Sequence, residues 1–190
     1  MAEQTTISKK NLKKIWVPLM ASKEFTNVEL GESHVYDVSQ LVGKVIDANL
    51  SMLTGDPKKQ NFKVIFKVKE IKENKGATEI MGYEIVKAYS RRLTKMSKGK
   101  IDETKNLKTK DNVKVILKIL ALSKHKPQNA VLTAVRKKLD EDVKEFVKNS
   151  NYQELIDAII SFRLQKDLQK DLKKIYPLSY LVVKTFKKLE

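Results

Sequence analysis

The residue types most often used in catalysis are sparse and scattered in this chain. It contains no cysteine, and its two histidines, His34 and His125, are 91 positions apart. The sequence contains no glycine-rich phosphate loop and no H-E-x-x-H zinc motif. We therefore interpret both histidines as surface or phosphate-contacting residues, and we expect no enzymatic activity, no cofactor and no metal.

One group of carboxylates offers a different chemistry. Asp140, Glu141, Asp142 and Glu145 lie close together in the sequence, and a metal-dependent nuclease could use such a group. Lys144, however, follows Asp140 by four positions and Glu141 by three, the spacings that pair opposite charges on a helix. We interpret the cluster as an exposed helix face.

The strongest functional signal is the charge. Lys and Arg number 39 against 23 Asp and Glu, a formal net charge of +16. Such a surplus repels itself in the folded state and favours a polyanionic partner, whose condensed counterions are released on binding. Only four of the basic residues are arginines, so point contacts to phosphates are favoured over bidentate contacts to base edges. We expect shape-directed RNA binding.

The basic residues are concentrated in three segments. These are an N-terminal arm over 1–14, the segment 91–110, where eight basic residues oppose Asp102 and Glu103, and the segment 124–138. The candidate RNA-binding basic residues are Lys9, Lys10, Lys13, Lys14, Lys44, Arg91, Arg92, Lys95, Lys98, Lys100, Lys105, Lys108, Lys110, Lys124, His125, Lys126, Arg136 and Lys137.

Trp16 is a further candidate RNA-binding residue, and it has two possible roles. It follows the lysines of the arm, so it could stack on a base. It could equally anchor the arm to the folded part, which we prefer because tryptophan is usually well buried. The paired stacking aromatics of an RNA-recognition motif are missing, since Phe62 and Phe66 share a face that we expect to be core.

The elements that position these residues point to an α+β protein. With 190 residues and 41% apolar content, the chain is long enough to bury a core. We expect a flexible basic arm over 1–14, an antiparallel β-barrel-like sheet over about 15–123, and a helical region over 124–190 packed on the barrel. The most apolar segment, Val113 to Leu122, is too short to span a bilayer, and no signal peptide is recognisable.

Within the sheet region the apolar residues mostly alternate. Residues 61–69 and 113–119 place apolar side chains on one face and lysines on the other, as half-buried strands do. A short helix is expected over 84–96, because Ile85, Tyr89 and Leu93 recur every four residues.

The period changes to that of helices after Pro127. One apolar stripe runs over 131–147, and Ser150 or Asn151 is suited to cap a following helix. A near-repeat then places three leucines of 164–172 on one face, and Tyr176-Pro177 ends that helix. Residues 180–186 are a possible last strand that returns to the sheet.

Several short segments, in their order and spacing, resemble a known family over nearly the whole chain. The segments are Lys13-Lys14-Ile15-Trp16, Tyr36-Asp37-Val38, Leu41-Val42-Gly43-Lys44, Leu53-Thr54-Gly55-Asp56, Phe66-Lys67-Val68, the Arg91-Arg92 helix, Thr109-Lys110-Asp111, Thr133-Ala134-Val135-Arg136-Lys137 and Ile175-Tyr176-Pro177-Leu178. They resemble the archaeal and eukaryotic small-subunit ribosomal proteins called S-three-A-e, or e-S-one.

The resemblance implies a β-barrel with appended helices that is a structural component of the small ribosomal subunit in the cytoplasm. Its implied partners are small-subunit ribosomal RNA, neighbouring ribosomal proteins and messenger RNA near the exit, with no membrane. The chain departs from the family pattern at Asn112, where a glycine is usual, and in a connection over 125–129 with few basic residues. Its short ends are more similar to archaeal members.

Two hypotheses follow. The first is a ribosomal structural protein that grips folded RNA through phosphates, with binding that weakens steeply as salt rises. The second is a free-standing module for single-stranded nucleic acid, in which Trp16 stacks on a base.

Overall fold

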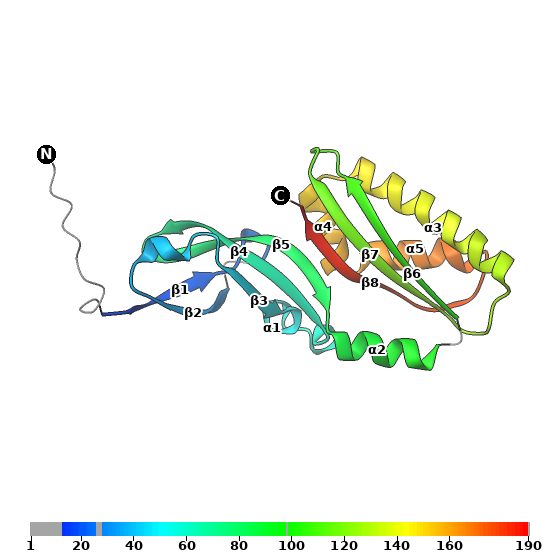
Figure 1. The fold of residues 1–190 in the computed structure, drawn as a ribbon, viewed down its shortest axis with the longest axis horizontal. Helices are drawn as coiled ribbons and strands as arrows, with labels where there is room; N and C mark the ends of the chain where they lie inside the picture. Colours follow the sequence, from blue (N-terminus) through cyan, green and yellow to red (C-terminus); the bar gives the residue numbers. More distant parts are fainter. Residues whose placement is uncertain (1–12, 26–27, 98, 190) are drawn as a thin grey trace, which may run out of the picture. The chain divides into compact units, whose positions relative to one another are not determined.

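A computed structural model describes residues 13–25, 28–97 and 99–189 (Figure 1). Most of the predicted arm, including Lys9 and Lys10, lies outside the described residues, as does Lys98. The elements in chain order are β1 (Ile15–Met20), η2 (Lys23–Phe25), β2 (Glu29–Val35), η3 (Val38–Leu41), β3 (Val45–Asn49), α1 (Leu50–Thr54), η4 (Pro57–Lys59), β4 (Phe62–Lys72), β5 (Lys75–Ile85), α2 (Lys87–Met96), β6 (Gly99–Lys108), β7 (Lys114–Ser123), α3 (Asn129–Asn149), α4 (Tyr152–Ile160), α5 (Arg163–Lys173) and β8 (Leu178–Lys188).

The strands form an open sheet, which corrects the expectation of a barrel. Their order is β2-β1-β5-β8-β7-β6, with β4 pairing with both β3 and β5. The sheet is not wholly antiparallel either, because β1 runs parallel to β5 over the pairs Leu19–Gly76 and Met20–Ala77. Among the described strands, β2 and β6 are the two ends of this strand order, and they do not pair with each other. A closed barrel requires that last ladder.

The chain divides into two compact units. The first comprises Met1–Ala48 and Ile65–Ile80. Its core holds Val17 and Leu19 of β1, Val35 of β2, Leu41 and Val68, all at most 8% exposed. The alternation along β1 and β2 buries these residues on one face and leaves the other face to solvent.

The second unit comprises Asn49–Val64 and Met81–Glu190. Its strands β6, β7 and β8 pair antiparallel, and β8 also pairs with the end of β5. Helices α3, α4 and α5 cover one face of these strands (Figure 1). The core includes the predicted stripe of α3, Val135, Leu139, Val143 and Val147, and the three leucines of α5, Leu164, Leu168 and Leu172.

Most of the predicted elements are confirmed. Strands β4 and β7 bury the expected apolar faces, and β8 is the expected last strand. Helix α4 begins with a capping box in which Asn151 is the N-cap and the Glu154 carboxylate accepts a hydrogen bond from the Asn151 N–H, at 2.9 Å. The short helix expected over 84–96 is present as α2, but it begins at Lys87, because Glu84 and Ile85 are the end of β5. None of the helices described here has the length and apolarity needed to cross a membrane.

Candidate RNA-binding groove

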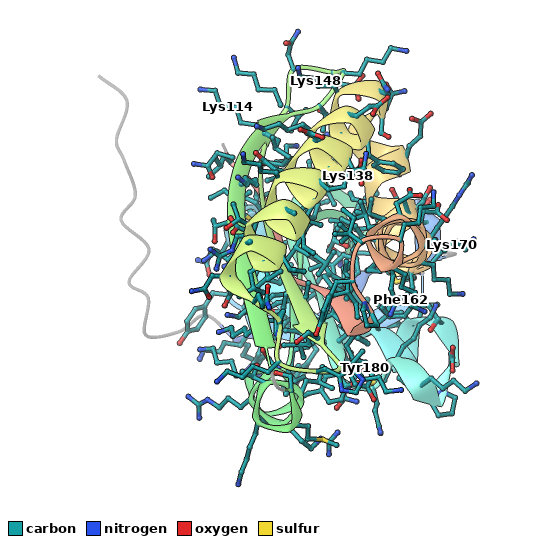
Figure 2. The ribbon with its side chains drawn as sticks, turned by 90° about the vertical axis from the view of Figure 1, so that its right-hand side faces the viewer. Lys114, Lys138, Lys148, Phe162, Lys170 and Tyr180 are labelled. Atoms are coloured by element: carbon teal, nitrogen blue, oxygen red, sulfur yellow. The ribbon has the colours of Figure 1, made fainter. Side chains whose placement is uncertain are left out.

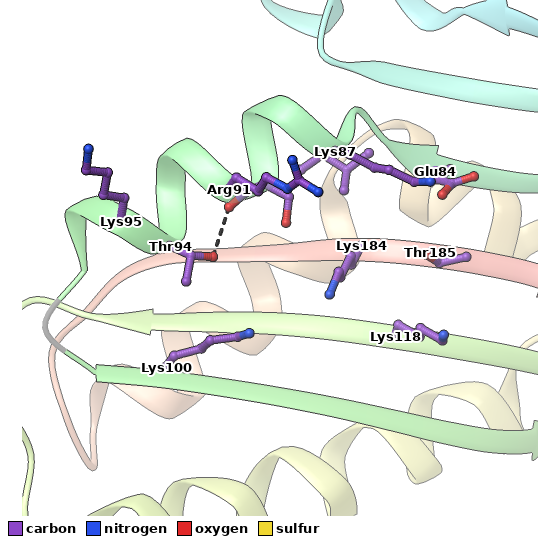
Figure 3. A pocket seen from close by; sticks show the side chains of 11 residues that line it. Glu84, Lys87, Arg91, Thr94, Lys95, Lys100, Lys118, Lys184 and Thr185 are labelled. Atoms are coloured by element: carbon purple, nitrogen blue, oxygen red, sulfur yellow. Dashed lines mark hydrogen bonds between the residues drawn. The ribbon is translucent and has the colours of Figure 1, made fainter.

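A groove of about 590 Å³ in the second unit gathers basic side chains from four elements. Figure 3 shows α2 on one side of it and the strands β6, β7 and β8 on the other. Six basic residues, Lys87, Arg91, Lys95, Lys100, Lys118 and Lys184, line it together with Glu84, Ile85, Ser90, Thr94 and Thr185. We call this the lysine groove.

Helix α2 orients its basic residues through a small buried stripe. Ser90 and Leu93 are buried, and the Thr94 hydroxyl donates a hydrogen bond to the Ser90 carbonyl at 2.9 Å. Arg91 and Lys95, four residues apart, lie on the side of α2 that lines the groove. Arg92 does not line it, since its guanidinium lies 5.1 Å from the centre of the Tyr89 ring. The adjacent arginines therefore have different surroundings.

The strands contribute lysines that are far apart in the sequence. In the ladder, Thr104 of β6 lies opposite Lys118 of β7, and Lys118 lies opposite Thr185 of β8. The side chains of Lys100 and Lys184 meet at one carboxylate, with each Nζ 3.1 Å from an oxygen of Asp102. Three neighbouring strands thus place lysines along one side of the groove (Figure 3).

Asp102 is held in its charged form by these lysines. Partial burial alone would raise the pKa of its carboxyl, but the hydrogen bonds from Lys100 and Lys184 outweigh burial, and the pKa is lowered. Within the described residues, Lys87, Arg91, Lys95 and Lys118 make no ion pair. Glu84 is the acidic residue that lines the groove beside six basic ones, so the groove keeps a positive surplus.

Two of the candidate residues form ion pairs with carboxylates of this chain. Lys105 lies 2.8 Å from the carboxylate of Asp140, and Arg136 lies 3.3 Å from that of Glu103. These pairs join β6 to α3, so much of the positive charge at Lys105 and Arg136 is balanced there. Both residues lie outside the lysine groove.

Other candidates are exposed elsewhere. Lys108 ends β6 about 27 Å from Lys100 along the strand, and Lys110 follows in the turn after it. The exposed segment Lys124–Lys126 leaves β7 at Ser123, which pairs with Gly99 and so lies at the Lys100 end. Lys137 is exposed on α3, and Lys44 in the first unit donates a hydrogen bond to the Ser33 hydroxyl at 2.6 Å.

Three groove lysines were missed by sequence reasoning. Lys87 precedes the predicted cluster, and Lys118 and Lys184 are outward positions of strands. Alternation predicts that such side chains face away from the core, but it does not say which strands are neighbours. The antiparallel pairing of β7 with β8 brings Lys118 and Lys184 together.

Trp16 is 63% exposed, so the expectation that it is buried is wrong. Its ring stacks on that of His34 in the next strand, with the centroids 4.4 Å apart and the planes 9° from parallel. Both residues belong to the first unit. Phe62 and Phe66 are buried as predicted.

The carboxylate cluster of α3 is used in ion pairs. Asp140 contacts Lys144 at 2.8 Å, which confirms the predicted i,i+4 pair, and Asp142 contacts Lys138 at 2.7 Å. No group of three or more histidines and carboxylates within the described ranges is arranged to hold a metal ion.

Comparison with known protein families identifies the relatives of this chain. The sequence matches the Ribosomal S3Ae family over residues 2–190. The chain belongs to the ribosomal S3Ae family. The resemblance inferred from the short segments is thereby confirmed.

Curated archaeal proteins named "Small ribosomal subunit protein eS1" are similar to this S3Ae chain. The protein of Halorubrum lacusprofundi is 28% identical over 175 residues, 92% of this chain and 81% of its own length. That of Methanocaldococcus jannaschii is 25% identical over 170 residues, 90% and 77% of the two chains. That of Staphylothermus marinus is 30% identical over 165 residues, 87% and 78%.

Proposed function

We propose that this S3Ae chain is a structural constituent of the small ribosomal subunit in the cytoplasm, and that the lysine groove binds ribosomal RNA there. The observation that carries the proposal is the convergence of six basic side chains from α2, β6, β7 and β8 in one groove. Family membership supports the ribosomal setting, since the relatives are named as small-subunit proteins. Neighbouring ribosomal proteins are proposed as further partners, and messenger RNA stays a prediction.

The composition of the groove favours phosphates over base edges. Five of its six basic residues are lysines, and no Asn or Gln side chain lines it. Lysine acts as a point charge towards phosphate, whereas Arg, Asn and Gln make the bidentate contacts that distinguish bases. The Thr185 hydroxyl adds a neutral donor beside the cations. The groove is therefore suited to the backbone of a folded RNA whatever its sequence.

A free-standing module for single strands is the second candidate. The exposed ring of Trp16 favours it, because exposed aromatic faces stack on unpaired bases. The two candidates differ in where the protein resides in the cell. A ribosomal constituent sediments with the small subunit, whereas a free-standing module stays at the top of a gradient.

Salt-dependent binding tests the groove. We expect the triple variant Arg91→Gln, Lys95→Gln and Lys118→Gln to bind a fragment of small-subunit ribosomal RNA less tightly than the wild type. The slope of log K against log salt concentration should become shallower by roughly three, about one for each lost phosphate contact. Titrations of the full chain between low and high salt supply the slope.

A variant with the same net charge is the control. Lys148, Lys166 and Lys173 are exposed on α3 and α5, and their replacement by Gln removes three charges outside the groove. We expect this control to change the slope much less. Equal slopes for the two triple variants would show that the total charge, and not the groove, determines binding.

A further inference from the structure

The first unit carries a cluster of exposed aromatic rings that lie outside its hydrophobic core. Trp16 is 63% exposed and Tyr36 is 43% exposed. Trp16 stacks on His34, and the Lys14 ammonium lies 5.0 Å from the centre of the Tyr36 ring. We call Lys14, Trp16, His34 and Tyr36 the aromatic platform. Figure 1 shows β1 and β2, which carry its centre.

The register of the two strands places these side chains on one face. Trp16 lies directly opposite His34 in the antiparallel ladder, and the adjacent pair is Ile15 with Val35. Side chains two positions apart share a face, so Lys14 accompanies Trp16 and Tyr36 accompanies His34. Val17 and Val35 point to the other face, into the core.

The geometry leaves the indole available to a ligand. His34 covers one face of the Trp16 ring at stacking distance. With 63% of the residue exposed, the opposite face of the indole lies in solvent. A planar ligand can therefore extend the existing stack of Trp16 on His34.

The charges around the platform favour a nucleotide over an apolar protein segment. The Lys14 ammonium stands beside the rings and supplies a contact for a phosphate. Glu32 lies two positions before His34 and is exposed on the same face. Its negative charge leaves the part of the platform around Lys14 as the part with positive charge. Aromatic rings next to a lysine on an exposed sheet face are the elements with which proteins bind single-stranded RNA.

We propose that the aromatic platform binds an unpaired nucleobase of single-stranded RNA, stacked on the free face of Trp16, with the adjoining phosphate at Lys14. The inference rests on the proposed RNA-binding function, and it adds a second contact of a different chemical kind. The lysine groove takes phosphates of folded RNA, whereas the platform takes a base that is not paired.

The fluorescence of Trp16 supplies a direct readout, because it is the only tryptophan in the chain. The probe is an RNA octamer of adenylates, compared with an abasic octamer that carries the same phosphates. We expect the adenylate octamer to quench the emission of the full-length protein and the abasic octamer to leave it unchanged. In the groove triple variant, quenching at saturating octamer should persist.

Substitutions separate stacking from charge. With a labelled octamer, Trp16→Ala should weaken binding by roughly 5- to 150-fold, the cost of losing one aromatic stacking contact. Trp16→Phe, which retains a ring, should recover part of the loss. Tyr180, 46% exposed on β8 in the second unit, provides the control, and Tyr180→Ala should leave affinity unchanged.

The outcomes distinguish the platform from the groove. If both octamers bind equally well, without quenching and without loss in Trp16→Ala, the platform proposal is overturned while RNA binding by the groove stands. If ribosomal RNA and both octamers fail to bind even at low salt, the proposed function itself is wrong. Loss of affinity only in Trp16→Ala, with the Tyr180→Ala control unchanged, supports the platform.

Discussion

Asp102 is the carboxylate that two cations of the lysine groove share. Its carboxylate holds the ammonium groups of Lys100 and Lys184 at 3.1 Å each, and its side chain is 29% exposed. An ion pair that accessible contributes little to folding stability. Its larger effect is on binding, because it competes with phosphates for two lysines.

We predict that Asp102→Asn binds RNA more tightly. Neutralising the carboxylate adds one positive charge to the groove and releases Lys100 and Lys184 for phosphate contacts. The affinity for ribosomal RNA at low salt should rise several-fold, and the slope of log K against log salt should steepen by about one to two. Titrations at several salt concentrations measure both quantities.

Asp167→Asn is the matched control, because Asp167 pairs with Lys170 on α5, away from the groove. Asp167→Asn removes the same charge as Asp102→Asn. Because it frees no lysine of the groove, it should increase the affinity for RNA less. A fall in affinity for Asp102→Asn would mean that the pairing of Lys100 and Lys184 prepares the groove for RNA and does not compete with it.

At the level of single residues, the sequence predicts half of the groove. Arg91, Lys95 and Lys100 stand out because they belong to one dense basic segment. Lys118 and Lys184 are single lysines on strands, indistinguishable from ordinary solvated positions until the strand partners are known. Neighbours in sequence mislead as well, since Arg91 lines the groove and Arg92 lies against Tyr89.

At the scale of elements, the junction of β5 with β8 depends on one glycine. Gly82 pairs with Lys187, and a Cβ at position 82 would lie 2.6 Å from the backbone carbonyl oxygen of Phe186. Backbone cannot move aside as a flexible side chain can, so β5 and β8 approach this closely only with glycine there.

We predict that Gly82→Ala destabilises the fold by about 1–3 kcal/mol, the usual cost of overpacking. Urea unfolding followed by circular dichroism measures the change. Ser179→Ala, at an exposed position of β8, is the control and should change the free energy of unfolding little. A Gly82→Ala variant as stable as the wild type would show that the two strands separate at no cost.

The contact between β6 and α3 includes a carboxylate with two cationic partners. Asp140 lies 2.8 Å from both Lys105 and Lys144, and these ammonium groups lower the pKa of its carboxyl. The folded state therefore releases this proton more readily than the unfolded chain does. The stabilisation is present above the unfolded pKa of about 3.9 and is lost as pH falls through the lower folded pKa.

Asp140→Asn should accordingly lower the free energy of unfolding by about 1 kcal/mol at pH 7. The difference from the wild type should begin to shrink below about pH 4, where the unfolded wild-type chain takes up this proton, and should vanish below the lower folded pKa. Urea unfolding at pH 7, 5 and 3 gives the profile. A constant difference at all three values would attribute the effect to packing and not to charge.

The sequence predicts elements well where an apolar period is long. The stripes of α3 and α5 and the alternation of β4 and β7 are all present. Closure of the sheet is a different matter, because alternation identifies a strand's faces but not its partners. The parallel contact of β1 with β5, only two residue pairs long, has no signature in either strand.

At the scale of the whole molecule, the net charge of +16 is spread unevenly over the folded surface. On the helices that cover the second unit, many lysines are paired, as Lys138 is with Asp142 and Lys170 with Asp167. Figure 2 shows Lys148 and Lys170 projecting from these helices. The lysine groove differs because four of its cations lack a carboxylate partner among the described residues.

This distribution is the reason that a charge-matched comparison is informative. Removing three charges anywhere lowers the long-range attraction to RNA, an effect that salt screens. Removing them in the groove also removes direct phosphate contacts, which release counterions when they form. The second loss should therefore lower the salt concentration that detaches the protein from a ribosomal particle more than the first loss does.

Sedimentation of cell lysates on sucrose gradients at increasing salt tests this most directly. We expect the wild-type chain to sediment with the small subunit at low salt. The groove variant Arg91→Gln, Lys95→Gln and Lys118→Gln should dissociate at lower salt than the variant with Lys148, Lys166 and Lys173 replaced by Gln. A wild-type protein found only at the top of the gradient at low salt, or the same dissociation point for both variants, would contradict a ribosomal role for the groove.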